Sequence, residues 1–246
     1  MNLILDIGNT FIKWAAFNGV EMKDNGVLRK DAELSLFLTS NIFHQIDACM
    51  LSTVGKVPMA VVDHLVQKKI DYYFLSHESS LPIINEYESP ETLGVDRVAG
   101  VIGARSVTNE NVLVIDVGTC ITYDCLSSAG IYKGGVISPG IQLRFNAMHD
   151  HTDKLPLIEW KDHFADEILK EGIDTETSMI SGVINGMVNE LSSWINEYEK
   201  LYKDLTVIMT GGDASYFESK LKSKIFVDQN IVLKGLNQIL IHERSS

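Results

Sequence analysis

The stretch Asp6-Ile7-Gly8-Asn9-Thr10 lies between two apolar segments, residues 3–5 and residues 11–17. This pattern predicts a strand, a tight turn and a second strand. A related stretch, Asp116-Val117-Gly118-Thr119, follows the apolar run 112–115 and leads into Ile121-Thr122-Tyr123. The sequence therefore predicts the same kind of hairpin twice.

Each hairpin carries groups suited to a phosphate site. A carboxylate at the end of a buried strand can hold hydrated Mg²⁺, directly or through water. The glycine two residues later lets the backbone turn sharply and approach a ligand, and the nearby N–H groups and Thr or Asn side chains can meet phosphate oxygens. One such turn is ordinary, because Asp and Gly are common in turns. Two of them indicate a nucleotide site in a cleft between two halves of the chain.

The composition is that of a globular protein. The chain has 246 residues, of which 45% are apolar and 22% charged, enough for one large or two moderate domains. The net charge of −12 argues against nucleic acid or an anionic membrane as a partner. An anionic substrate would need local cations, for which a metal ion, Lys13, Arg97 and Arg144 are candidates.

The cysteines and the hydropathy pattern predict a cytoplasmic protein. Cys49, Cys120 and Cys125 form no CxxC pair, which fits a reducing compartment. The sequence shows no signal-peptide pattern and no run of 18 apolar residues.

Hydrophobic periodicity and turn residues predict an α/β order of elements. Helices are expected at 31–45, 58–69, 141–148, 183–202 and 230–241, strands at 48–52, 72–75, 134–138 and 206–209, and turns at Asn18-Gly19 and Asp24-Asn25-Gly26. We expect one domain over residues 1–111 and a similar one over residues 112–246, each beginning with its hairpin.

Two further stretches, and the absence of two common nucleotide-binding motifs, bear on function. Asp96 and Arg97 open a helix of small and apolar residues, where Asp96 could be a capping acid or a functional carboxylate. His149-Asp150-His151 is better explained as a polar loop than as a metal site. No Walker loop and no G-x-G-x-x-G is present, which disfavours the common nucleotide folds.

Six motifs in order resemble those of the type III pantothenate kinases, in the acetate and sugar kinase/Hsp70/actin superfamily. They are Asp6 to Thr10, Glu91 to Arg97, Asp116 to Asp124, Gly134 to Gly140, Thr175 to Gly182 and Thr210 to Ala214. The resemblance implies two similar actin-like, ribonuclease H-like domains, each a mixed sheet flanked by helices. It also implies ATP-dependent phosphorylation of pantothenate, the first step towards coenzyme A.

The resemblance assigns roles to individual residues. Asp6 would hold Mg²⁺, Asp116 would hold a monovalent cation (K⁺ or NH₄⁺) or Mg²⁺, and Asp96 would be the general base. ATP and its phosphates would be bound by Gly8, Asn9, Thr10, Gly118, Thr119, Thr122, Gly211 and Gly212, and by Lys13 unless that lysine is merely exposed on its strand. Pantothenate would be bound by Tyr87, Gly94, Val95, Asp96 and Arg97, and by Thr175 of the neighbouring subunit in a homodimer.

Two other functions stay open at this point. A non-catalytic transcriptional accessory protein could share the fold, since a fold does not fix a function. A kinase or phosphatase acting on a sugar or acetate is a further possibility, against which Tyr87 and the Leu-Gly-x-Asp-Arg motif argue.

Overall fold

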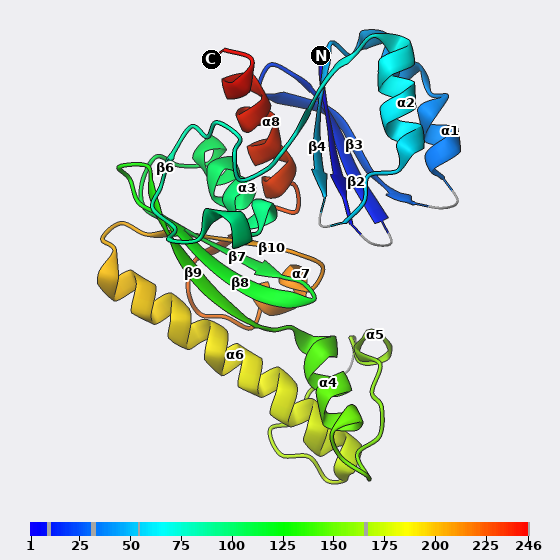
Figure 1. Cartoon of the computed structure of the whole chain (residues 1–246). Helices are drawn as coiled ribbons and strands as arrows, with labels where there is room; N and C mark the ends of the chain where they lie inside the picture. The colour runs from blue at the N-terminus through cyan, green and yellow to red at the C-terminus, as the bar shows by residue number, and fades with distance from the viewer. Residues whose placement is uncertain (9–10, 31–32, 54, 165–166, 246) are drawn as a thin grey trace. The chain divides into compact units, whose positions relative to one another are not determined.

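The structure is a computed structural model that describes residues 1–8, 11–30, 33–53, 55–164 and 167–245. The chain divides into two compact units. The first unit comprises residues 1–109, 129–133 and 230–246, and the second comprises residues 110–128 and 134–229. Each unit contains strands of a mixed sheet and helices that cover them (Figure 1).

A five-stranded sheet in the order β3-β2-β1-β4-β5 forms the centre of the first unit. Its strands are β1 (Asn2–Ile7), β2 (Phe11–Asn18), β3 (Glu21–Arg29), β4 (Ala48–Thr53) and β5 (Asp71–Phe74). Strand β1 is antiparallel to β2 and parallel to β4, so it occupies the middle of the sheet. Its buried apolar residues explain that central position, because both faces of β1 are covered.

Helices cover both faces of this sheet. They are α1 (Leu34–Leu38), α2 (Met59–Lys68) and α8 (Ile231–Glu243). The unit also contains α3 (Val95–Gly103), which packs on α8, and the 3₁₀ turns Asn41–Gln45, Pro90–Thr92 and Ala104–Ser106. Leu3, Leu5 and Ile7 share a core with residues of α1 and α2. Asn2 bonds Asn237 of α8 on the other face. Since side chains alternate along a strand, Asp6 lies on the face of Asn2 and α8.

Helix α8 belongs to the first unit, whereas residues 112–246 were expected to form the second domain. It packs against α3, beside which it lies in Figure 1. A Cβ on Gly103 would collide with the backbone of Ile231, and a Cβ on Gly235 would collide with the carbonyl of Ala99. These two glycines let the helix backbones touch, which explains the small residues of α3.

The second unit is built on β11-β10-β7-β8-β9. Its strands are β7 (Val112–Val117), β8 (Cys120–Leu126), β9 (Ile131–Pro139), β10 (Thr206–Thr210) and β11 (Ile225–Val227). Strand β9 starts in the first unit, where Ile131 and Tyr132 pair with β6 (Ile84–Asn85). Strand β7 is antiparallel to β8 and parallel to β10, as β1 is to its two neighbours.

One face of this second sheet carries a core shared with its helices. The helices are α4 (Ile141–Asp150), α5 (Trp160–His163), α6 (Thr175–Leu201) and α7 (Ala214–Glu218). Ile115, Val117 and Tyr123 of the hairpin share that core with Ile184, Met187 and Leu191 of α6. In Figure 1, α6 runs along the sheet and α4 lies beside its N-terminal half. Asp116 points to the opposite face, because it alternates with Ile115 and Val117.

The predicted α/β fold of two mixed sheets is confirmed, but three local predictions were wrong. Asp24-Asn25-Gly26 lies inside β3 instead of forming a turn, and Gly26 leaves room for the indole of Trp14. The predicted helix 31–45 is split into α1 and a 3₁₀ turn, and His149-Asp150 extends α4 instead of forming a loop.

Helix α6 starts two turns earlier than the periodicity of residues 183–202 indicated. Asp174 and Thr177 form a capping box there, in which the Thr177 N–H donates to the Asp174 carboxylate at 2.8 Å. The cap satisfies N–H groups that a helix start leaves unpaired.

Along the described ranges of the chain, no helix is both long and apolar enough to cross a membrane.

Candidate functional site

Asp6 is the half-buried, second-to-last residue of β1, and it lies between two neighbouring strands. It pairs in register with Lys13 on β2 and with Ser52 on β4, so the three side chains share one face. The Ser52 hydroxyl donates a hydrogen bond to Asp6 Oδ1 at 3.1 Å. Burial raises the pKa of Asp6, and the nearby Asp96 carboxylate raises it further, while Ser52 and Lys13 lower it. The net result is a carboxylate that lacks full compensation for its charge.

The turn after β1 is tight. The Gly8 N–H donates to the Phe11 carbonyl at 2.9 Å, and a Cβ on Gly8 would lie only 3.1 Å from that same oxygen. Asn9 and Thr10, expected to bind phosphate, lie outside the described residues. Lys13 is exposed and sits on the same face as Asp6, where its charge acts on the carboxylate.

The start of α3 presents the second carboxylate of the first unit. Gly94 is the N-cap, Val95 is the first helical residue, and Asp96 lies in the first turn. The Arg97 N–H donates to Asp96 Oδ1 at 3.0 Å, so the carboxylate turns back onto the helix start. A Cβ on Gly94 would come within 2.6 Å of Asp96 Oδ1, which explains the glycine there.

Arg97 and Tyr87 form a polar and aromatic wall next to this helix start. Arg97 is only 8% exposed, and its guanidinium carbon lies 5.8 Å from the centre of the Tyr87 ring. Tyr87 in turn stacks on the buried Tyr132 at 6.3 Å between ring centres. A guanidinium held over a ring in this way is positioned to recognise a fixed polar group.

Asp6 and Asp96 belong to the same unit, and the Asp96 carboxylate acts on the Asp6 pKa although the two residues are far apart in the sequence. Asp6 lies on the face of the sheet that α8 covers. Asp96 lies in the first turn of α3, and α3 packs on α8. In such a site one carboxylate can bind a cation while the other accepts a proton.

The second hairpin repeats the first arrangement in the second unit. Asp116 pairs with Thr122 across β8 and with Thr210 across β10. The Gly118 N–H donates to the Cys120 carbonyl at 3.0 Å, which closes the turn and leaves Thr119 exposed.

Two glycine turns pack directly on this hairpin. Gly211 has a φ of +94°, and a Cβ there would collide with the Asp116 carboxylate and the Val117 carbonyl. Gly212 is exposed beside it. On the other side the Gly140 N–H donates to the Thr119 carbonyl at 3.0 Å, and a Cβ on Gly140 would collide with the Gly118 carbonyl. The predicted phosphate and adenosine residues of the second half thus lie together.

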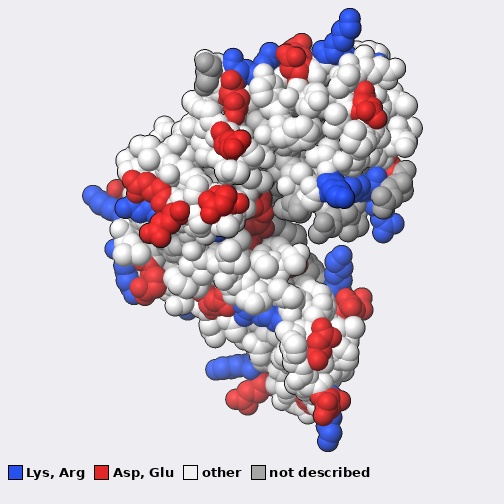
Figure 2. Space-filling view, viewed as in Figure 1, with Lys and Arg blue, Asp and Glu red and all other residues white. Residues whose placement is uncertain are grey.

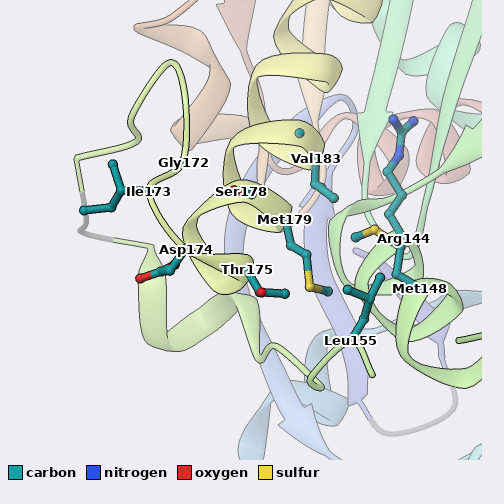
Figure 3. Close-up of a pocket in the computed structure, with 11 residues that line it drawn as sticks. Arg144, Met148, Leu155, Gly172, Ile173, Asp174, Thr175, Ser178, Met179 and Val183 are labelled. Atoms are coloured by element: carbon teal, nitrogen blue, oxygen red, sulfur yellow. The ribbon is translucent and has the colours of Figure 1, made fainter. Parts of the chain in front are cut away.

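Thr175 lies apart from that hairpin, on the wall of an open pocket of about 900 Å³ between α4 and the start of α6 (Figure 3). The apolar side chains of Met148, Leu155, Ile173, Met179 and Val183 line it. Arg144 also lines the pocket, but its guanidinium extends away from Thr175 and Met179. It bonds Glu190 at 2.6 Å, so this candidate cation is already paired with a carboxylate.

The charged side chains and the potential metal ligands of the described residues do not gather in one cluster. Figure 2 shows acidic and basic side chains interspersed on the visible face. Within the described ranges, no group of three or more His, Cys, Asp or Glu side chains could hold a metal ion. Magnesium that arrives with a nucleotide needs only one or two protein carboxylates besides phosphate oxygens and water, so Asp6 fits that requirement.

Sequence reasoning missed Ser52 and the Arg144–Glu190 pair. Ser52 follows an apolar run and precedes Thr53, and only the pairing of β4 with β1 shows that its hydroxyl faces Asp6. The ion pair joins residues 46 positions apart on different helices, and no local pattern indicates such a contact.

Solved structures share the fold at low sequence identity. A Campylobacter jejuni protein described as a Baf-family transcriptional activator superposes with a TM-score of 0.62 at 19% identity, covering 99% of this chain and 100% of the other. A ROK hexokinase from Thermus thermophilus gives a TM-score of 0.52 at 12% identity, covering 96% and 97%. At such identities the likeness concerns the fold and carries no function.

Sequence comparison is more specific. The family description "Type III pantothenate kinase" matches residues 2–197. Proteins of that name from Bacteroides fragilis and Christiangramia forsetii are 41% and 40% identical to this chain, each over 98% of it and over 97% and 98% of their own lengths. The chain therefore belongs to the family of type III pantothenate kinases.

Proposed function

We propose that this chain transfers the γ-phosphoryl group of ATP to the terminal hydroxyl of pantothenate, the first step of coenzyme A biosynthesis. The observation that carries the proposal is that the first unit holds Asp6, flanked in register by Lys13 and Ser52, together with Asp96 at the start of α3, next to the Arg97–Tyr87 wall. Phosphoryl transfer depends mainly on positioning and on neutralising charge, and these residues supply both.

Asp96 is the general base of this proposal. Its carboxylate accepts the proton of the pantothenate hydroxyl as that oxygen bonds to the γ-phosphorus and the bond to the ADP oxygen breaks. Arg97, held over Tyr87, hydrogen-bonds the pantothenate, and Gly94 and Val95 let the substrate approach the start of α3.

The two hairpins bind the nucleotide. Asp6 holds Mg²⁺, which neutralises charge on the phosphates when bound. Gly8, Asn9, Thr10 and Lys13 contact phosphate oxygens from the first hairpin, and Gly118, Thr119 and Thr122 contact them from the second. Asp116 holds a monovalent cation, K⁺ or NH₄⁺, or Mg²⁺, and Gly211 and Gly212 lie against the adenosine. The contact of Gly211 with Asp116 supports placing these two functions side by side.

Thr175 acts from the neighbouring subunit of a homodimer. Its exposure at the start of α6, on the wall of an open pocket, supports a role towards a second chain. A cytoplasmic location remains part of the proposal, because ATP and pantothenate would be met there.

The test is ATP-dependent phosphorylation of pantothenate with Mg²⁺ and K⁺, comparing the wild type with Asp96→Asn. We expect turnover by the wild type and a fall in kcat of roughly 10²–10⁴-fold in the variant, the usual contribution of a general base. Asp63→Asn, at an exposed position of α2, is the matched control and should keep wild-type rates.

The outcomes separate the parts of the proposal. Unchanged turnover in Asp96→Asn would keep the kinase but remove Asp96 as its base. A folded wild type that binds ATP but does not phosphorylate pantothenate would favour the non-catalytic accessory protein.

A further inference from the structure

We infer that Arg144 and Glu190 are positioning residues that fix the second phosphate hairpin for ATP. The inference rests on the proposed function, because it assigns a task to that hairpin's nucleotide site. Neither residue is placed in contact with the substrates. Both act through the turn that ends β9.

Arg144 joins three parts of the second unit. Its Nε donates to the Pro139 carbonyl at 2.8 Å, and its Nη2 donates to the Ser138 hydroxyl at 2.9 Å and to Glu190 Oε2 at 2.6 Å. A planar guanidinium can serve several acceptors in fixed directions, which a lysine cannot do. Arg144 therefore ties the end of β9 to the middle of α6.

Glu190 extends the connection to the hairpin strand. Its Oε1 accepts a hydrogen bond from the Tyr123 hydroxyl at 3.3 Å, and Tyr123 lies on β8, which forms the second arm of the hairpin. Burial raises the pKa of the Tyr123 hydroxyl, and the Glu190 carboxylate raises it further, so the hydroxyl stays a proton donor. Glu190 thus receives bonds from both Tyr123 and Arg144.

Residues 138–140, which Arg144 holds, pack directly against residues 118–119 of the second hairpin. Gly140 follows Ser138 and Pro139 directly, and its N–H donates to the Thr119 carbonyl at 3.0 Å. No side chain fits between Gly140 and the bend, because a Cβ on Gly140 would collide with the Gly118 and Thr119 carbonyls. A shift of residues 138–140 must therefore move the N–H groups proposed to meet phosphate.

The arrangement also shows that the charge of Arg144 is not directed at the Thr175 pocket. The guanidinium extends away from Thr175 (Figure 3), and the side chains of Arg144 and Glu190 are 22% and 23% exposed. At this partial burial a short, charge-assisted bond is stronger than a surface ion pair. The aliphatic part of the Arg144 side chain lines the pocket, whereas its guanidinium bonds residues 138 and 139 at the end of β9.

The experiment is steady-state kinetics of Glu190→Gln with ATP and pantothenate varied in turn, together with titration of a non-hydrolysable ATP analogue with Mg²⁺. We expect the KM for ATP to rise about tenfold, which corresponds to the loss of one hydrogen bond between charged groups. Analogue binding should weaken by the same factor, and the KM for pantothenate should stay at its wild-type value.

Two further variants accompany it. Glu197→Gln removes an exposed pair with Lys200 on the same helix and should change nothing. Arg144→Lys keeps the charge but loses the three-way geometry, so it should weaken ATP binding in the same direction as Glu190→Gln. If Glu190→Gln fails to fold, Tyr123→Phe removes only one hydroxyl from the network and is measured in the same way.

Two results would overturn the inference. One is an unchanged KM for ATP in a folded Glu190→Gln, and the other is a rise confined to the KM for pantothenate, which would indicate action through the Thr175 pocket. Failure of the proposed function can be told apart from failure of this inference, because a wild type without turnover can still bind the ATP analogue. Weaker analogue binding by the variant would then support the positioning role alone.

Discussion

At the scale of single residues, the buried charge of Asp6 lowers the stability of the folded protein. Its pKa is raised above the ordinary value of 3.8, chiefly by burial and also by Asp96. The native state therefore binds the Asp6 proton more tightly than the unfolded chain does. The free energy of unfolding falls as the pH rises from 3.8 through the raised pKa, and the penalty is complete above that pKa.

We expect Asp6→Asn to be more stable than the wild type at pH 7 and nearly inactive. The amide keeps an acceptor for the Ser52 hydroxyl but removes the buried charge and the proposed Mg²⁺ ligand. The gain in melting temperature should shrink as the pH falls through the raised pKa and disappear below 3.8, where the wild-type carboxyl is protonated in both the native and the unfolded state. Asp71→Asn, at an exposed position of β5, controls for the change in net charge. A loss of stability at pH 7 would contradict this account.

At the scale of elements, the crossing of α3 and α8 fixes the start of α3, where Asp96 and Arg97 lie. We expect Gly235→Ala to lower the free energy of unfolding by about 1–3 kcal/mol, the usual cost of overpacking. The added methyl would collide with the Ala99 carbonyl, so α3 must shift. The KM for pantothenate should rise with it. Denaturant unfolding and steady-state kinetics measure the two effects.

The control for that substitution is Gly186→Ala in α6, where a Cβ meets no atom within 4 Å. An alanine in a helix is favoured over glycine by up to about 1 kcal/mol, so this variant should gain stability. An equal change in the free energy of unfolding in both variants would show that the α3–α8 contact is not tight.

Elements with strong local patterns could be predicted from the sequence, and those fixed by distant partners could not. Helix α2 and the later part of α6 carry clear apolar periodicity. The first two turns of α6 are polar and depend on the Asp174–Thr177 cap. The sequence around Gly26 predicts a turn, because nothing local indicates that the indole of Trp14 occupies the space above it.

At the scale of the whole molecule, motif order indicated the two hairpins and the site residues near them, while the assignment of α8 depended on packing. Residues 230–246 follow the second unit in sequence but contact β1, β2, β4 and α3 of the first. Apolar periodicity predicts that α8 is buried on one side, but it contains no information about which sheet covers that side. Asp6 and Asp96 could be identified by motif, whereas Ser52 required the strand register.

The last expectation follows from that packing. Deleting residues 231–246 removes the buried side chains of Ile231, Leu233, Leu236, Ile239 and Leu240 from the first unit. Each contributes roughly 1.5–3 kcal/mol, and together they approach the whole stability of a domain, about 5–15 kcal/mol. Hydrogen exchange should therefore show lost protection in β1 and β4, with β7 and β8 still protected. Deleting only residues 245–246 should leave both sets protected. Equal loss in both units would mean that they unfold as one cooperative body, despite the separate contacts that define them.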